Sequence, residues 1–115
     1  MTAPATCAWL SVRGLAKRYA ATPVFAALDL ALDKGQTLAV IGASGCGKTT
    51  LLRILAGLDR ADSGSVRIDG RELSTATPQT RGAVYLYQEP PLFPHLDVFE
   101  NIAFGLRLRA LRVTI

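Results

Sequence analysis

Cysteine, histidine and tryptophan are scarce in this sequence, with two, one and one residues among 115. The two cysteines, Cys7 and Cys46, form no C-x-x-C pair and lack the spacing of metal ligands. A disulfide scaffold and a zinc site are therefore excluded as the basis of the fold. We expect reduced thiols and a cytoplasmic protein.

Long apolar runs are also absent, although 50% of the residues are hydrophobic. No run approaches the roughly eighteen residues that a membrane-spanning helix needs. The first residues lack the basic start and apolar core of a signal peptide. We predict that residues 1–8 are disordered and that the chain is soluble by itself.

Blocks of positive charge are missing as well. Thirteen Lys and Arg stand against nine Asp and Glu, for a formal net charge of +4, and the longest basic block is Lys17-Arg18. Nucleotide binding accounts for this scattered charge, so no nucleic-acid partner is expected.

What the sequence does contain is a glycine-rich turn, residues 42–50, between an apolar run and a helical pattern. Its Gly42, Gly47, Lys48 and Thr49 fit the G-x-x-x-x-G-K-[ST] template of nucleotide-binding P-loops. The flanking patterns fit too, since residues 37–41 predict a buried strand and residues 51–58 a helix. A glycine-rich turn without a ligand is the alternative, and this flanking structure disfavours it.

The template requires these residue types for physical reasons. Glycines at 42, 45 and 47 permit positive φ and remove Cβ atoms, so that backbone N–H groups can converge on phosphate oxygens. Lys48 can supply a mobile charge to the β- and γ-phosphates, and the Thr49 hydroxyl can join the shell of a Mg²⁺ ion. On the residues alone, Thr50 is expected to pack or to cap the helix.

The remaining pattern predicts an α/β fold. The expected strands are residues 9–15, 24–32, 37–41, 65–68 and 83–87. One helix is expected after residue 50, with Gly57 as its stop. The last helix is expected after Asp97, which can cap it. Asp69-Gly70 predicts a tight turn. Residues 9–115 are therefore interpreted as an incomplete P-loop domain, with an antiparallel β portion near the N-terminus and a parallel core.

Two features of the sequence have two interpretations each: Tyr19, and the pair Leu92 and Phe93. Tyr19 could fill a gap in the core, or its flat ring could stack on a base. Leu92 and Phe93 lie between prolines on a predicted surface loop, where they could contact a partner or tuck back into the domain. The pattern alone does not decide between these interpretations.

Several of these features occur in the order known from one family. Tyr19, residues 42–49, Gln88 and residues 92–106 resemble the ATP-binding subunit of an ABC transporter, of the bacterial type that imports sulfate, iron, polyamines, sugars or similar solutes. The resemblance runs from about Trp9 to Leu108.

This resemblance implies an ATP and Mg²⁺ site. Tyr19 would stack on adenine, Lys48 would contact the phosphates, Thr49 would hold Mg²⁺, and Gln88 would reach the metal and the attacking water. Lys48 and Gln88 are thus the expected catalytic residues, and Thr49 and Gln88 the metal ligands. The residues implied to bind the phosphates are Gly42, Ala43, Ser44, Gly45, Cys46, Gly47, Lys48, Thr49 and Thr50.

The resemblance also implies partners. The region Gln88–Phe104 would contact a transmembrane permease subunit, and a second ATP-binding subunit would complete a dimer. A solute-binding protein would take part indirectly. The chain is thus expected on the inner face of the cell membrane, held there by the permease. His95 has no expected catalytic role.

Some motifs of the family are absent. The sequence has no L-S-G-G-Q signature, no apolar strand ending in Asp-Glu and no later switch histidine. We therefore expect a truncated or frame-shifted product, with hydrolysis confined to a complete subunit. The alternatives are a nucleotide-binding fragment without turnover and a nucleic-acid-associated P-loop ATPase.

Overall fold

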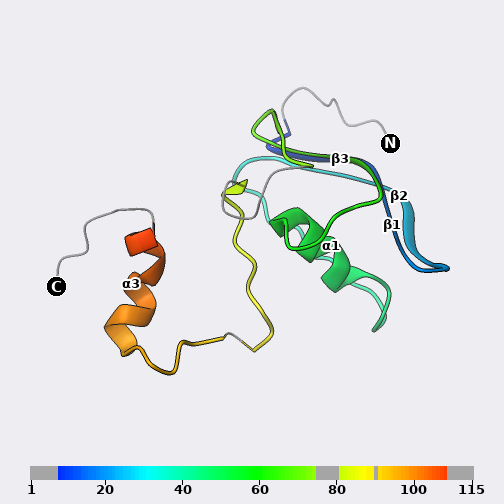
Figure 1. Cartoon of the computed structure of the whole chain (residues 1–115). Coiled ribbons are helices and arrows are strands. Elements are labelled where there is room, and N and C mark those ends of the chain that lie inside the picture. The colour runs from blue at the N-terminus through cyan, green and yellow to red at the C-terminus, as the bar shows by residue number, and fades with distance from the viewer. Residues whose placement is uncertain (1–7, 75–80, 90, 109–115) are drawn as a thin grey trace. The chain divides into compact units, whose positions relative to one another are not determined.

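The computed structural model describes residues 8–74, 81–89 and 91–108. The chain divides into two compact units, Met1–Tyr85 and Leu86–Ile115 (Figure 1). No helix in the described ranges is long and apolar enough to cross a membrane.

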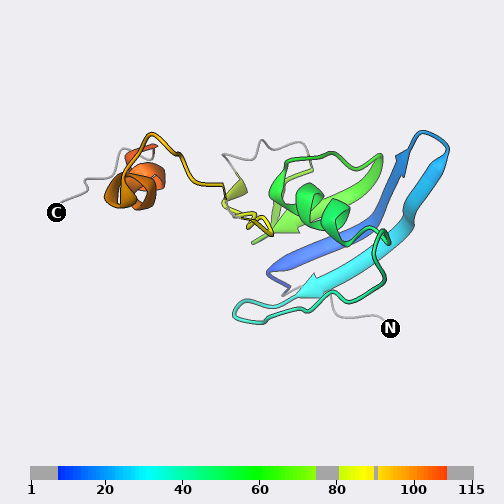
Figure 2. The ribbon, with the colours of Figure 1, turned by 90° about the horizontal axis from the view of Figure 1, so that it is seen from below.

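The first unit contains a four-stranded antiparallel sheet. Its elements are β1 (Leu10–Tyr19), β2 (Thr22–Leu32), β3 (Ser63–Ile68) and β4 (Arg71–Glu72), in the spatial order β2-β1-β3-β4 (Figure 2). The predicted antiparallel portion is thus confirmed. β2 begins two residues earlier than predicted and includes Pro23, which an edge strand tolerates because its outer N–H groups need no partner.

A bulge in β1 sets which side chains face the core. The pairing with β2 shifts between Val12 and Leu15, where Gly14 has φ 58° and its N–H donates to Asp29 Oδ1 at 2.6 Å. One extra residue reverses the alternation of a strand. Leu15 and Lys17 are therefore buried together with Leu10 and Val12, which the simple alternation predicted for residues 9–15 does not give.

The helix α1 (Lys48–Ala56) covers one face of this sheet (Figures 1 and 2). Leu51 and Ile54 of α1 pack with Leu10, Val12, Leu15 and Val66 in one apolar core. Gly57 ends the helix with φ 83°, and the Leu58 N–H donates to the Arg53 carbonyl at 2.8 Å. The predicted helix and its glycine stop are confirmed.

The turn between β3 and β4 also follows the prediction. Asp69 and Gly70 have φ values of 52° and 77°, as a two-residue hairpin turn of the I′ type requires.

The two predicted buried strands, residues 37–41 and 83–87, are wrong for this structure. Neither segment forms a strand, and Ile41, Val84 and Leu86 are 91%, 79% and 83% exposed. A strand buried in a parallel sheet needs hydrogen-bonded neighbours, and in the described part of the chain neither segment pairs with another strand. Apolar β-branched residues alone do not form such a strand.

The second unit contains the helix α3 (Val98–Leu108) and the loop before it. Asp97 caps α3, because its Oδ1 accepts the Glu100 N–H at 2.7 Å and Glu100 Oε2 accepts the Asp97 N–H at 3.3 Å. The predicted cap is confirmed. Within this unit the rings of Phe93 and Phe104 lie 4.6 Å apart.

Candidate nucleotide-binding site

The glycine-rich loop leads directly into the start of α1. Gly45 and Gly47 have φ values of 81° and 101°, and the Cys46 N–H donates to the Ala43 carbonyl at 3.2 Å. The first hydrogen bond of α1 runs from the Leu51 N–H to the Gly47 carbonyl at 2.9 Å. The N–H groups of residues 48–50 therefore lack partners within the helix and form the positive end of its dipole.

Lys48 folds back over this loop. Its Nζ donates to the carbonyl oxygens of Gly42 and of Ala43, the latter at 2.8 Å, and lies 3.7 Å from Cys46 Sγ. The ammonium group and the helix N-terminus thus face the same loop. Two positive groups on one loop can bind an anion, and phosphate oxygens suit both.

At two glycines of the loop, an added Cβ would force a neighbouring side chain to shift. A Cβ on Gly42 would meet Cys46 Sγ at 2.6 Å, and a Cβ on Gly47 would meet Val24 Cγ1 at 2.4 Å. The second contact joins the loop to β2. The hairpin of β1 and β2, which also carries Tyr19, therefore touches the phosphate-binding candidate directly.

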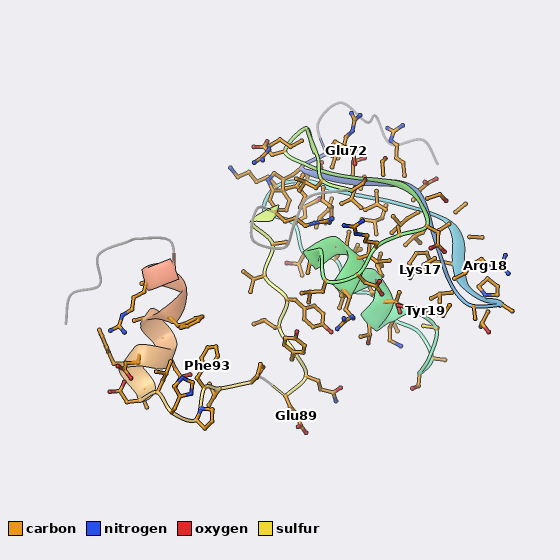
Figure 3. All side chains as sticks on the ribbon, viewed as in Figure 1. Lys17, Arg18, Tyr19, Glu72, Glu89 and Phe93 are labelled. Atoms are coloured by element: carbon orange, nitrogen blue, oxygen red, sulfur yellow. The ribbon has the colours of Figure 1, made fainter. Side chains whose placement is uncertain are left out.

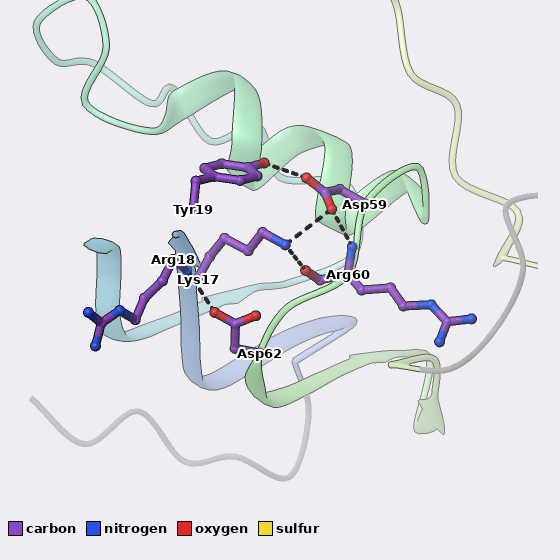
Figure 4. A network of polar contacts seen from close by, with 6 residues as sticks. All are labelled: Lys17, Arg18, Tyr19, Asp59, Arg60 and Asp62. Atoms are coloured by element: carbon purple, nitrogen blue, oxygen red, sulfur yellow. Dashed lines mark hydrogen bonds and ion pairs between the residues drawn. The ribbon is translucent and has the colours of Figure 1, made fainter. Parts of the chain in front are cut away.

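Tyr19 ends β1 and is 47% exposed, so it does not fill a gap in the core. Its hydroxyl donates to Asp59 Oδ2, and Lys17 Nζ lies 4.9 Å from the centre of its ring. Figure 3 shows Tyr19 and Lys17 near α1, and Figure 4 shows the ring beside that helix. The ring is thus held by side-chain contacts while half of its surface stays open.

Asp59 is a functional candidate that the sequence reasoning missed. Its carboxylate accepts the Tyr19 hydroxyl, the Arg60 N–H at 2.8 Å and the Lys17 ammonium at 3.2 Å. These contacts, the Tyr19 hydrogen bond first, hold the pKa of Asp59 below its usual value, although partial burial acts in the opposite direction. No local pattern identifies this residue, because its side-chain partners Tyr19 and Lys17 lie 40 and 42 positions away.

Arg81 is a second residue that the sequence reasoning missed. It is only 7% exposed, and its Nη1 donates to the carbonyls of Ile54 at 2.9 Å and Leu55 at 3.4 Å. These carbonyls lie in the last turn of α1, whose acceptors need partners outside the helix. Arg81 therefore fastens the segment that leads toward Gln88 to the end of α1.

The other predicted site residues are distributed over both units. Ser44 and Thr49 are exposed and Thr50 is half-buried, all in the first unit with Lys48 and Tyr19. Gln88 is exposed and belongs to the second unit. The first unit thus contains every predicted site residue except Gln88.

The predicted partner region has an ordered loop. The Asn101 side chain accepts the Phe93 N–H at 3.0 Å and donates to the Leu96 and Asp97 carbonyls at 3.0 and 2.9 Å. Phe93 leans on Phe104, whereas Leu92 is 74% exposed. The two interpretations of Leu92 and Phe93 therefore apply to different residues. Phe93 packs within its own unit, and Leu92 faces outward.

Comparison with known proteins decides the family. The family model described as ABC transporter matches residues 25–114, which is well over half of the chain. The chain belongs to the ABC transporter family. The resemblance noted from Tyr19, the glycine-rich loop and Gln88 is thereby confirmed at the level of the family.

Its relatives within the ABC transporter family include import proteins. The chain is 46% identical over 100 residues to the sulfate/thiosulfate import ATP-binding protein CysA of Bordetella pertussis, covering 87% of this chain and 28% of that protein. It is 41% identical over 99 residues to the sn-glycerol-3-phosphate import ATP-binding protein UgpC 1 of Rhizobium johnstonii, covering 86% and 27%. The spermidine/putrescine import ATP-binding protein PotA of Methylococcus capsulatus is 46% identical over 101 residues, at 88% and 26% coverage.

A solved structure supports the fold. A nucleotide-free ATP-binding cassette from an ABC transporter matches with a TM-score of 0.60 and 24% identity, covering 62% of this chain and 28% of that one. The α/β class with an incomplete P-loop domain is thus confirmed. The chain spans little more than a quarter of the length of these relatives.

Proposed function

We propose that this chain is the nucleotide-binding part of an ABC transporter's ATP-binding subunit and that residues 42–50 bind the phosphates of MgATP. The observation that supports this most is the position of Lys48, whose Nζ donates to the carbonyls of Gly42 and, at 2.8 Å, of Ala43 beside the start of α1. A triphosphate would exchange these carbonyl contacts for stronger ones with anionic oxygens. The family membership supports the same assignment.

The residues of the loop fit this role. The N–H groups of residues 48–50 would donate to phosphate oxygens, and Lys48 would reach the β- and γ-phosphates. Gly42 and Gly47 let the loop backbone pack closely against Cys46 and Val24, because a Cβ at either position would meet one of these side chains at 2.6 Å or less. Ala43, Ser44, Gly45 and Cys46 complete the curve around the phosphates.

Mg²⁺ would be held by the Thr49 hydroxyl together with phosphate oxygens. In the described residues no group of three or more His, Cys, Asp or Glu side chains could hold a metal ion by itself. A hydroxyl beside a phosphate-binding loop suits Mg²⁺, which keeps most of its shell as water and phosphate oxygen. When bound, the ion neutralises charge on the phosphates, and Gln88 would approach it as a further ligand.

Tyr19 would supply the platform for adenine. Tyr19 is 47% exposed, and its hairpin contacts Gly47 of the glycine-rich loop through Val24. A base stacked on such a ring gains about 1–3 kcal/mol. Base and phosphates would then be bound from one compact unit.

Transport would require a longer subunit and its partners. The curated relatives are named as import ATP-binding proteins, and we assign the same coupling of ATP hydrolysis to solute import to the complete subunit. A second ATP-binding subunit would complete the catalytic site. The complex would lie on the cytoplasmic face of the membrane, with a solute-binding protein acting indirectly.

The permease subunit would contact the region Gln88–Phe104. Leu92, Val98 and Ile102 are 74%, 77% and 75% exposed, which is unusual for large apolar side chains. Such a surface suits an apolar segment of a membrane protein. The hydrogen bonds of the Asn101 side chain to Phe93, Leu96 and Asp97 would hold this loop in one conformation for that contact.

Titration calorimetry with MgATP tests the nucleotide site. Lys48→Ala should weaken binding roughly a hundredfold or more, because it removes a charged donor to two phosphates. Lys34→Ala is the matched control, since Lys34 lies in an exposed turn after β2 and loses the same charge. Equal affinity of the Lys48→Ala variant and the unmodified chain would refute the assignment.

A further inference from the structure

Tyr19 belongs to a network of polar contacts with residues that the proposed site does not include (Figure 4). It joins the end of β1 to residues 59–62, the connection between α1 and β3. Its charged members are Lys17 and Arg18 on β1 and Asp59, Arg60 and Asp62 on the connection. Two carboxylates hold it together, and they act on different parts of β1.

Asp59 binds side chains. Its Oδ2 accepts the Tyr19 hydroxyl, and its Oδ1 accepts the Lys17 ammonium at 3.2 Å. Lys17 is only 8% exposed and donates a second hydrogen bond, at 2.6 Å, to the Arg60 carbonyl. Because both ends of the Lys17–Asp59 pair have further partners, its geometry is fixed more firmly than that of an exposed ion pair.

Among the described residues, the contacts of Asp62 are with the backbone of β1. Its Oδ2 accepts the Arg18 N–H at 2.7 Å, and its own N–H donates to the Ala16 carbonyl at 2.8 Å. The Arg18 side chain points away from Tyr19 in Figure 4. Asp62 thus extends the strand pairing, whereas Asp59 holds the ring.

The Lys17 ammonium also approaches the ring itself, at 4.9 Å from its centre. This distance lies within the range of a cation–π contact. Tyr19 is therefore fixed at two points, by its hydroxyl and by the cation near its ring, and still exposes 47% of its surface. A ring fixed in this way loses little further freedom when a flat ligand stacks on it.

We infer that Asp59, together with Lys17, is a positioning residue for the base of a bound nucleotide, because it fixes the Tyr19 ring in one orientation. This inference rests on the proposed function, in which Tyr19 stacks on adenine. Asp59 itself contacts neither base nor phosphate. Its effect should therefore depend on whether the ligand has a base.

The test compares two ligands, MgATP and magnesium tripolyphosphate, which has the phosphates but no base. Calorimetric titration of the full chain should show that Asp59→Asn weakens MgATP binding roughly three- to tenfold and leaves tripolyphosphate binding unchanged. Tyr19→Phe keeps the ring and removes the hydroxyl, so it should give the same loss. Tyr19→Ala should weaken MgATP binding more, by roughly five- to a hundredfold.

Asp62→Asn is the matched control, since it changes the same kind of carboxylate in the same connection. It should leave the ratio of the two affinities unchanged. An unchanged ratio in Asp59→Asn, or an equal loss for both ligands, would overturn the positioning role and leave a purely structural one. If the unmodified chain binds neither ligand, the proposed function fails first, and the inference fails with it.

Discussion

The antiparallel sheet with α1 and the two segments 37–41 and 83–87 all contain apolar residues, and the segments are the more apolar of the two regions, yet the residues differ in burial. In the sheet, Val12, Leu15 and Val66 are each 1% exposed, whereas Leu38, Val84 and Leu86 are 49%, 79% and 83% exposed. The sheet forms because β1 pairs with β2 across a short turn and with β3, which follows β2, the glycine-rich loop and α1 in the chain. Burial thus follows from available hydrogen-bonded neighbours, not from hydrophobicity alone.

The largest expected effect is a difference in the free energy of unfolding between one leucine substitution in the sheet and one in residues 83–87. Leu15→Ala should lower the free energy of unfolding by about 2–5 kcal/mol, because it leaves a cavity in the core. Leu86→Ala removes the same atoms from an exposed site and should change it by less than about 0.5 kcal/mol. Urea denaturation followed by circular dichroism measures both. Losses of similar size would mean that residues 83–87 are buried in solution and that the comparison is mistaken.

A smaller effect shows where in the glycine-rich loop the packing against β2 ends. Gly47→Ala requires a side chain at φ 101° and places its Cβ 2.4 Å from Val24, whereas Gly45→Ala meets nothing within 4 Å at φ 81°. Both variants have an unfavourable backbone, but only the first also overpacks the contact with β2. Gly47→Ala should therefore be less stable than Gly45→Ala by about 1–3 kcal/mol. Thermal unfolding of the two variants gives this difference, and equal midpoints would show that the loop does not rest on β2.

The smallest effect concerns pH and the tie between Asp59 and Tyr19. The pKa of Asp59 is lowered in the folded chain from its ordinary value of 3.8, so the carboxylate stabilises the fold above that pH. This stabilisation should decline as the pH falls below 3.8 toward the lowered pKa, because the protonated acid accepts these hydrogen bonds poorly. Stability curves of the unmodified chain and Asp59→Asn should therefore converge on acidification. A constant difference between pH 7 and pH 2 would contradict the assignment.

Local interactions let the sequence determine much of this protein. The helical pattern of residues 51–58 with the Gly57 stop is enough to predict α1, and Asp97 is enough to predict the start of α3. Strand-like patterns predicted three strands of the antiparallel sheet, and the glycine-rich loop indicated the family together with Tyr19, Gln88 and residues 92–106. Caps, turns and periodic apolar faces involve residues a few positions apart, so the sequence shows them directly.

Only the tertiary structure decided what depends on distant partners. The bulge at Gly14 reverses the alternation of β1 and turns Leu15 and Lys17 toward α1. Asp59 meets Tyr19 from 40 positions away, and Arg81 meets Ile54 from 27. Residues 37–41 and 83–87 have strand-like composition, yet a strand exists only where another strand completes its hydrogen bonds. The sequence thus determined α1, the start of α3, the antiparallel strands and the glycine-rich loop, and the fold decided which side chains hold the Tyr19 ring and which apolar segments are buried.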